Sequence, residues 1–169
     1  SELAQSNVEN LVRRLGVELY THVIDWPEYR ALMQSFFDAD VVDIELLYDN
    51  AMFAVNYRLA ARYKVRWILA GTNTSTEGMR MPPGWNWFKF DAHNIRRIAA
   101  TGGVGGFRTF PAIGVLGYVW YEYIRRIKWV SFLDLMDYRK EAALQVLEAE
   151  CGYRRYPYKH YESIFTRFY

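Results

Sequence analysis

Two hydrophobic patterns alternate in the first part of the chain. Apolar side chains three and four positions apart predict a helix over residues 2–15, which ends at Gly16. The next segment, 17–24, reads VELYTHVI, and its β-branched and aromatic residues predict a strand. Pro27 suits a first helical turn and predicts a helix over 26–38. A strand between two helices is therefore expected here.

The middle of the chain continues this alternation. An apolar stripe predicts a helix from about residue 46 to 63, and VRWILA at 65–70 predicts a second strand that ends at Gly71. Helices alternating with strands are typical of α/β domains built on a parallel sheet. We therefore predict the α/β class, in a single domain over 1–169.

The second half is expected to be mainly helical. Aromatic residues make up 18% of the chain, and the segment 113–126 is so aromatic that its helix is expected to be buried or to lie at an interface. An α/β part is thus expected over about 1–100 and an aromatic-rich helical part over about 107–169. The elements predicted here are a helix capped by Asp91 up to about residue 100, a TGGVGG turn, a helix over 113–126, a short strand over 128–130 and a helix over 138–150 that ends at Gly152.

Charge and cysteine content narrow the class of function. The chain carries 21 basic and 19 acidic side chains, a balance too even to attract nucleic acid or a membrane through the field of the whole molecule. Most of the excess positive charge lies after residue 95, where an anionic ligand is expected. Cys151 is the only cysteine and is expected to be buried and inert. With no apolar run of about 18 residues, the chain is expected in the cytoplasm without a membrane partner.

The loop after the second predicted strand is the strongest candidate for chemistry. Residues 71–77, GTNTSTE, place hydroxyls, an amide and a carboxylate at the carboxyl end of a parallel strand, where open α/β sheets bind ligands. Gly71 permits close approach, and Glu77 offers an oxygen ligand to Mg²⁺. An ordinary Ser/Thr-rich turn is the structural alternative.

Two other groups of charged residues are candidates. Asp43, Glu45 and Asp49 lie between two predicted helices and could serve a metal or a substrate amine, or form a solvated loop. His160 lies among Lys159, Glu162 and Arg167, a basic cluster that could grip a phosphate or form a solvated tail. TGGVGG lacks the spacing of a phosphate-binding loop and is expected to be a turn.

Short motifs along the whole chain occur together in a combination that is typical of one protein family. This set resembles the N-acetyl sugar amidotransferases, which belong to the PP-loop ATPases with an adenine nucleotide alpha-hydrolase-like fold and occur in bacterial surface-polysaccharide pathways. The resemblance covers essentially the whole chain. The motifs that carry it are Ser1-Glu2-Leu3, Asn7-Val8-Glu9-Asn10-Leu11, Val23-Ile24-Asp25-Trp26, Asp49, Ile68-Leu69-Ala70-Gly71-Thr72-Asn73, Thr76-Glu77-Gly78, Lys89 with Asp91, Thr109-Phe110-Pro111, Tyr156-Pro157, Lys159-His160-Tyr161-Glu162-Ser163 and Phe165-Thr166-Arg167-Phe168.

The resemblance implies an ATP-dependent amidotransferase that converts the acetamido group of a nucleotide-linked sugar into an acetamidino group. In such an enzyme ATP adenylates the amide oxygen, with Mg²⁺ beside the phosphates, and ammonia from a separate glutaminase displaces AMP. Glu77 matches the magnesium-binding position of PP-loop relatives, and Gly71, Thr72 and Asn73 match the loop on the nucleotide side.

For six further residues, the resemblance gives a match to family motifs but no defined role. Contact with the sugar nucleotide is inferred from their polarity alone. These candidates for catalysis are Lys89, Asp91, Lys159, His160, Glu162 and Arg167.

One motif of the family is missing from these residues. The SGGxDS phosphate loop, expected after the first strand of the fold, occurs nowhere in the chain. We therefore expect the C-terminal part of such an enzyme, with an incomplete parallel sheet, no activity by itself, and weak or lost binding of ATP and Mg²⁺. Because missing strands leave sheet edges unpaired, a homo-oligomer is also expected.

Two other classes of function stay open. Basic and aromatic residues interleave over 153–169, which suits an RNA- or nucleotide-binding module related to tRNA-modifying PP-loop proteins. The net charge of +2 is low for a nucleic-acid partner. The chain could also be an inert fragment whose exposed surfaces make it oligomerise.

Overall fold

The computed structural model describes residues 2–74, 82, 84–85 and 87–157. The chain divides into two compact units. The terminal unit consists of Ser1–Thr21 with Met136–Tyr169, and the central unit consists of His22–Leu135. The division into an α/β part and a helical part of one domain stays a prediction.

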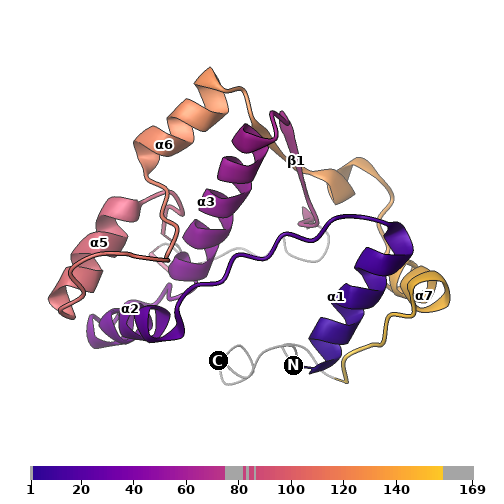
Figure 1. The fold of residues 1–169 in the computed structure, drawn as a ribbon, viewed down its shortest axis with the longest axis horizontal. Coiled ribbons are helices and arrows are strands. Elements are labelled where there is room, and N and C mark those ends of the chain that lie inside the picture. Colours follow the sequence, from indigo (N-terminus) through magenta and orange to yellow (C-terminus); the bar gives the residue numbers. More distant parts are fainter. Residues whose placement is uncertain (1, 75–81, 83, 86, 158–169) are drawn as a thin grey trace. The chain divides into compact units, whose positions relative to one another are not determined.

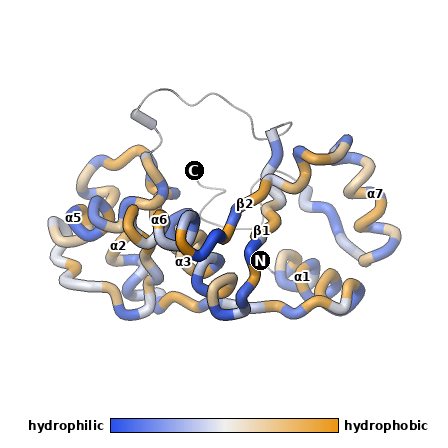
Figure 2. The backbone as a smooth tube through the Cα atoms, turned by 90° about the horizontal axis from the view of Figure 1, so that it is seen from above, coloured by the Kyte–Doolittle hydropathy of each residue, from blue (hydrophilic) through white to orange (hydrophobic). Residues whose placement is uncertain are grey.

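Two helices form the described core of the terminal unit. α1 (Glu2–Leu15) packs against α7 (Lys140–Cys151), and both helices mix hydrophobic and hydrophilic positions (Figure 2). The buried Asn7 side chain donates a hydrogen bond to the carbonyl of Arg154 and accepts one from its N–H, both at 2.9 Å. Both predicted helices are confirmed, and Cys151 is buried as expected.

The central unit contains helices and a small parallel sheet. β1 (Trp67–Ala70) pairs with β2 (Lys128–Ser131), so that Trp67 faces Lys128 and Ala70 faces Ser131. This confirms the α/β class at a coarse level, together with both strands. The other elements of the unit are α2 (Trp26–Asp38), α3 (Leu46–Arg62), α5 (Ala92–Thr101), α6 (Val115–Val119), a π-helical turn (Trp120–Ile124) and a 3-10 turn (Phe132–Leu135).

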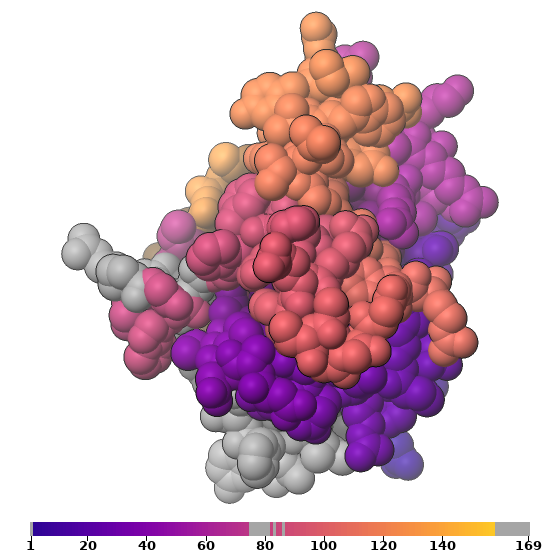
Figure 3. Space-filling model, turned by 90° about the vertical axis from the view of Figure 1, so that its left-hand side faces the viewer, coloured from indigo at the N-terminus to yellow at the C-terminus, as the bar shows by residue number. Residues whose placement is uncertain are grey.

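Helix α3 contributes to both apolar clusters of the central unit. In one cluster the start of α3 packs with α2 and α5 through residues such as Leu47, Leu32 and Ile95, all fully buried. In the other, Tyr57 and Ile127 pack below the sheet. Figure 1 shows α3 beside β1, and Figure 3 shows α5 (coral) lying against α2 (purple). Because α3 contributes to both clusters, it fixes the sheet relative to the helical part of this unit.

The TGGVGG stretch begins as a turn, as predicted. Gly102 follows α5 where this helix approaches α2, and a Cβ at Gly102 would overlap the side chain of Ser35. Gly103 has a φ of +78°, which L side chains rarely adopt. The glycines here permit a close helix contact, and no phosphate-binding role is needed to explain them.

The strand predicted over 17–24 is wrong. These residues form neither helix nor strand, and Val23 is 76% exposed. Strand propensity expresses how well a side chain fits a pleated, half-buried surface, so it takes effect only beside another strand. In the described part of the chain, the only strand ladder joins β1 and β2. The segment therefore has strand-like residues without a strand neighbour.

The single helix predicted over 113–126, expected to be buried or to lie at an interface, is wrong in its extent. The segment forms the short α6 followed by the π-helical turn, and only one face of it is partly buried. On that face Tyr118 stacks on Phe90 and Tyr121 stacks on Tyr57, with ring centroids 4.1 and 5.4 Å apart. On the other face Leu116 is 86% exposed. Its role at an interface stays a prediction.

Two cationic residues occupy a backbone conformation that favours glycine, which allows a test of the fold. Lys64 and Arg126 have φ values of 57° and 54°. We expect Lys64→Gly to raise the free energy of unfolding by about 0.5–1 kcal/mol, because relief of left-handed strain exceeds the added entropy of the unfolded chain. Urea denaturation measures this, with Lys64→Ala as control. If Lys64→Ala raised the free energy of unfolding equally, the cause would be the lost charge and not the relief of backbone strain.

Candidate functional site

Polar residues gather where β1 and β2 end. Residues 71–74 follow β1, Ser131 is the last residue of β2, and Asp134 lies in the turn after it. The Oγ1 of Thr72 lies 3.3 Å from the Oγ of Ser131. The N–H of Thr74 donates to Asp134 Oδ1 at 2.8 Å, and its hydroxyl donates to the same oxygen at 3.1 Å. We call residues 71–74, Ser131 and Asp134 the polar edge.

The polar edge follows from the parallel register of the strands. Because paired parallel strands end at the same side of a sheet, the loops that follow them must meet there. Gly71 and Thr72 lie at this edge as predicted, and the Asn73 side chain is only 7% exposed. The space beside Gly71 is open, since a Cβ there would meet no atom within 4 Å. Glu77, the predicted magnesium ligand, lies outside the described residues.

Asp134 and Ser131 were not predicted as site residues. The carboxyl-end rule that selects residues 71–74 applies equally to the strand over 128–131, so the signal was present in the sequence. What the sequence did not show is that these two strands are neighbours. Carboxylate and hydroxyl oxygens are the ligands that Mg²⁺ prefers, and one carboxylate suffices when substrate phosphates supply the rest. Asp134 therefore fits the role of a metal ligand at this edge.

Lys89 lies at a second polar place, between two carboxylates. Its Nζ is 2.9 Å from both carboxylate oxygens of Asp43 and 2.9 Å from Asp49 Oδ2. Burial alone would lower the pKa of Lys89, but its hydrogen bonds to the two carboxylates outweigh burial and raise this pKa. The ammonium is thus held protonated, which suits a structural or charge-stabilising role and not that of a base.

Two of the three acidic residues predicted to serve a metal or a substrate amine bind a lysine of the chain itself. The amine that Asp43 and Asp49 hold is that of Lys89, and Glu45 is exposed at the start of α3 without a capping hydrogen bond. In the described residues no three His, Cys, Asp or Glu side chains are grouped in a way that could hold a metal ion. Of the three residues, only Glu45 is exposed to solvent, as the alternative of a solvated loop expects.

Asp91 acts as the cap that the sequence predicted. Its Oδ1 accepts the N–H of Asn94 at 2.9 Å, and its Oδ2 accepts the indole N–H of Trp87 at 3.0 Å. Burial would raise the pKa of Asp91, but these hydrogen bonds and the nearby charge of His93 lower it. Asp91 is accordingly engaged in holding the start of α5.

A buried asparagine that sequence reasoning missed supports the same region. The fully buried side chain of Asn50 donates to the carbonyls of Lys89 and Ile113 at 2.7 and 2.8 Å and accepts the N–H of Ile113 at 3.0 Å. It links α3 to two loops far away in sequence. Nothing in the local sequence pattern distinguishes Asn50 from an exposed helical asparagine.

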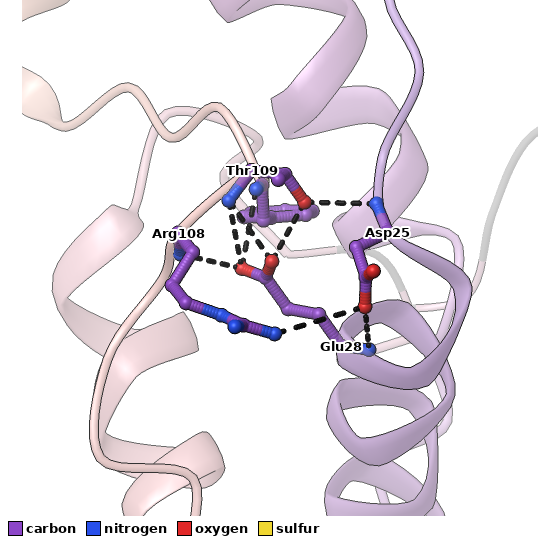
Figure 4. A network of polar contacts seen from close by, with 5 residues as sticks. Asp25, Glu28, Arg108 and Thr109 are labelled. Atoms are coloured by element: carbon purple, nitrogen blue, oxygen red, sulfur yellow. Dashed lines mark hydrogen bonds and ion pairs between the residues drawn. The ribbon is translucent and has the colours of Figure 1, made fainter.

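A carboxylate from α2 organises the loop before α6. Glu28 accepts N–H groups of Arg108, Thr109 and Phe110 at 2.8, 2.9 and 3.2 Å, and the hydroxyl of Thr109 at 2.6 Å (Figure 4). Thr109 in turn accepts the N–H of Asp25. Two motifs of the resemblance, at 23–26 and 109–111, thus meet in one network.

The remaining predicted residues cannot be placed. Lys159, His160, Glu162 and Arg167 lie outside the described residues. The structure therefore assembles Gly71, Thr72 and Asn73 at one place, and joins Lys89 and Asp91 to Asp43, Asp49 and Trp87 at another.

The chain was compared with family models, with curated proteins and with solved structures, and none of the three comparisons finds a match. Among the described residues, no helix has the length and apolar character needed to cross a membrane.

The Glu28 network predicts a pH-dependent contribution to stability. Burial would raise the pKa of Glu28, but hydrogen bonds from Thr109, Phe110 and Arg108 lower it from an ordinary 4.5 to about 2. The contribution is complete above the unfolded pKa and is lost as pH falls from about 4.5 to about 2. We expect Glu28→Gln to cost about 2 kcal/mol at neutral pH. Chemical denaturation at pH 7 and pH 3 checks this, and a difference that stays constant with pH would contradict it.

The bridge at Lys89 predicts a different mutational pattern. Lys89→Met leaves two carboxylates facing each other, so we expect a loss of about 2 kcal/mol in the free energy of unfolding. Adding Asp43→Asn removes the repulsion, and the double variant is expected to recover part of the loss. Urea denaturation of both proteins measures the difference. A double variant less stable than Lys89→Met would show that repulsion is not the cause.

Proposed function

We propose that this chain provides part of an ATP-dependent amidotransferase that acts on the acetamido group of a nucleotide-linked sugar. The observation that carries the proposal is the polar edge, where the loop resembling the nucleotide-side loop of PP-loop enzymes meets Ser131 and Asp134. The edge lies at the carboxyl ends of parallel strands, which is the ligand-binding side of open α/β sheets. The resemblance of motifs along the chain supplies the reaction.

The chemistry explains why ATP is needed. An amide oxygen is a poor leaving group, so the amide oxygen attacks the α-phosphorus of ATP and pyrophosphate leaves. Ammonia then adds to the activated carbon, AMP departs with that oxygen, and loss of a proton gives the acetamidino group. In this scheme Asp134 would hold Mg²⁺, which would offset the charge of the phosphates. The hydroxyls of Thr72 and Ser131 are donors for phosphate oxygens.

Lys89 and Asp91 have supporting roles in this proposal. Both are held by other protein groups, Lys89 by Asp43 and Asp49 and Asp91 by the start of α5. We assign them to positioning the segment 87–91. Direct contact with the sugar nucleotide is left to Lys159, His160, Glu162 and Arg167, which match the more family-specific motif.

Two partners belong to the proposal. A separate glutaminase supplies the ammonia, as the resemblance implies. A second copy of the chain is the other, because Trp67 and Leu69 on one face of β1 are 63% and 62% exposed, while parallel sheets are normally covered on both faces. The nucleotide-linked N-acetyl sugar is the substrate.

Binding of Mg-ATP tests the polar edge. We expect the chain to bind Mg-ATP only weakly, with a dissociation constant of about 1 mM, because the SGGxDS loop is not among its residues. Asp134→Asn should weaken this binding roughly tenfold or more, while the matched control Asp137→Asn, which removes an exposed carboxylate three positions away, should not. Titration calorimetry measures all three proteins. If both variants bind Mg-ATP as the unsubstituted chain does, Asp134 is not a ligand of Mg²⁺.

Catalysis needs its own measurement. When the chain carries an upstream segment with an SGGxDS loop, we expect AMP release that depends on both ammonia and a nucleotide-linked acetamido sugar. Release of AMP with ATP alone would indicate a nucleotidase, and absence of AMP with every such sugar would refute the amidotransferase proposal.

A further inference from the structure

The central unit contains a cavity that shares no residue with the polar edge. It has a volume of about 530 Å³. Three arginines from different elements line it: Arg58 from α3, Arg96 from α5 and Arg108 from the loop before α6. His22 also lines it, and none of the lining residues is acidic. A cavity of this size and charge suits a small anionic ligand.

Among the residues that the structure describes, none of the three guanidinium groups is tightly paired with a carboxylate. Arg58 donates to the carbonyl of Ala112 at 3.3 Å, and the guanidinium of Arg96 lies 5.7 Å from the ring centroid of Phe107. Arg108 has an ion pair with Asp25, but at 3.8 Å and largely exposed. Such a pair contributes little. In the described part of the chain, neither Arg58 nor Arg96 has a carboxylate within 4.0 Å.

The wall of the cavity is held in place by the Glu28 network. Glu28 binds the N–H groups of residues 108–110, so the loop that carries Arg108 has a fixed backbone (Figure 4). The carbonyl of Thr109 accepts a hydrogen bond from Nε2 of His22 at 3.0 Å. Glu28 binds these backbone donors and is not itself among the residues that line the cavity.

We propose that this cavity binds a diphosphate group. Guanidinium groups present paired N–H donors that match phosphate oxygens, and three arginines in one cavity offer enough donors for two adjacent phosphates. A single carboxylate ligand would leave most of these donors unused. The site shares no residue with the polar edge, so it is a separate binding site on the central unit.

Two sources of a diphosphate are compatible with this chemistry. One is the nucleotide-linked sugar, and the other is ATP or the pyrophosphate that it releases. The choice between them rests on the proposed function. The diphosphate site itself does not depend on the proposed function, because it is inferred from the arginines that line the cavity.

Arginine substitutions with a matched control test the site. We expect inorganic pyrophosphate to bind the full chain with a dissociation constant of about 0.1 mM in low salt, and Arg58→Gln with Arg96→Gln to weaken it at least roughly tenfold. The control, Arg62→Gln with Arg97→Gln, removes two exposed charges from the same helices α3 and α5 but outside the cavity, and should change binding by less than about twofold. Thermal melting verifies that all variants are folded.

Three results would each overturn the proposal. One is failure of pyrophosphate to bind the unsubstituted chain, and another is equal weakening in the two double variants, which would mean binding by general positive charge. Tight binding of inorganic phosphate with no gain for pyrophosphate would also reject the diphosphate assignment.

A second set of titrations distinguishes the source. A uridine-diphosphate N-acetyl sugar and ADP are each competed against pyrophosphate, and the tighter competitor identifies the ligand. Asp134→Asn separates this site from the polar edge, since it should weaken Mg-ATP and leave pyrophosphate unchanged. If the chain completed with an SGGxDS loop releases no AMP with any nucleotide-linked acetamido sugar, while pyrophosphate binding still depends on Arg58 and Arg96, the proposed function fails and the diphosphate site stands.

Discussion

The carboxylate of Glu28 is the interaction on which the arrangement of the central unit most depends. It ties α2 to backbone N–H groups 80 to 82 residues later in the chain, an ordering for which no local sequence preference exists. A buried carboxylate that loses these donors would carry a large desolvation cost, so helix and loop must stay together. The cavity lined by Arg58, Arg96 and Arg108 exists because this loop is fixed.

Helix α3 connects that region to the sheet. Its first turn packs with α2 and α5, its later turns pack under β1 and β2, and Asn50 between them binds the segments around Lys89 and Ile113. One helix therefore supports the polar edge, the bridge at Lys89 and one wall of the cavity. Without Asn50, the backbone groups of Lys89 and Ile113 would lose their partner.

Charged side chains in the central unit differ in whether other protein groups bind them. Lys89 and Asp91 match family motifs, yet their contacts are with Asp43, Asp49, Trp87 and α5. Arg58 and Arg96 match no motif and still line a cavity without acidic residues. Polarity in a motif thus identifies residues that matter, but the partners of each group decide what it does.

The sequence by itself determined α1, α2, α3, α5, α7 and the existence of the two short strands, because periodicity, capping residues and β-branched runs act over neighbouring positions. It predicted α1, α2, α3, the Asp91 cap and the loop of residues 71–73 at a strand end. It predicted a strand over 17–24 that does not form, and it missed Asp134, Glu28 and the arginine cavity. Those features depend on which segments become neighbours: a strand needs a second strand, and a carboxylate's role depends on donors from elsewhere in the chain. Only the tertiary structure decides such pairings, because they join residues dozens of positions apart that local patterns do not connect.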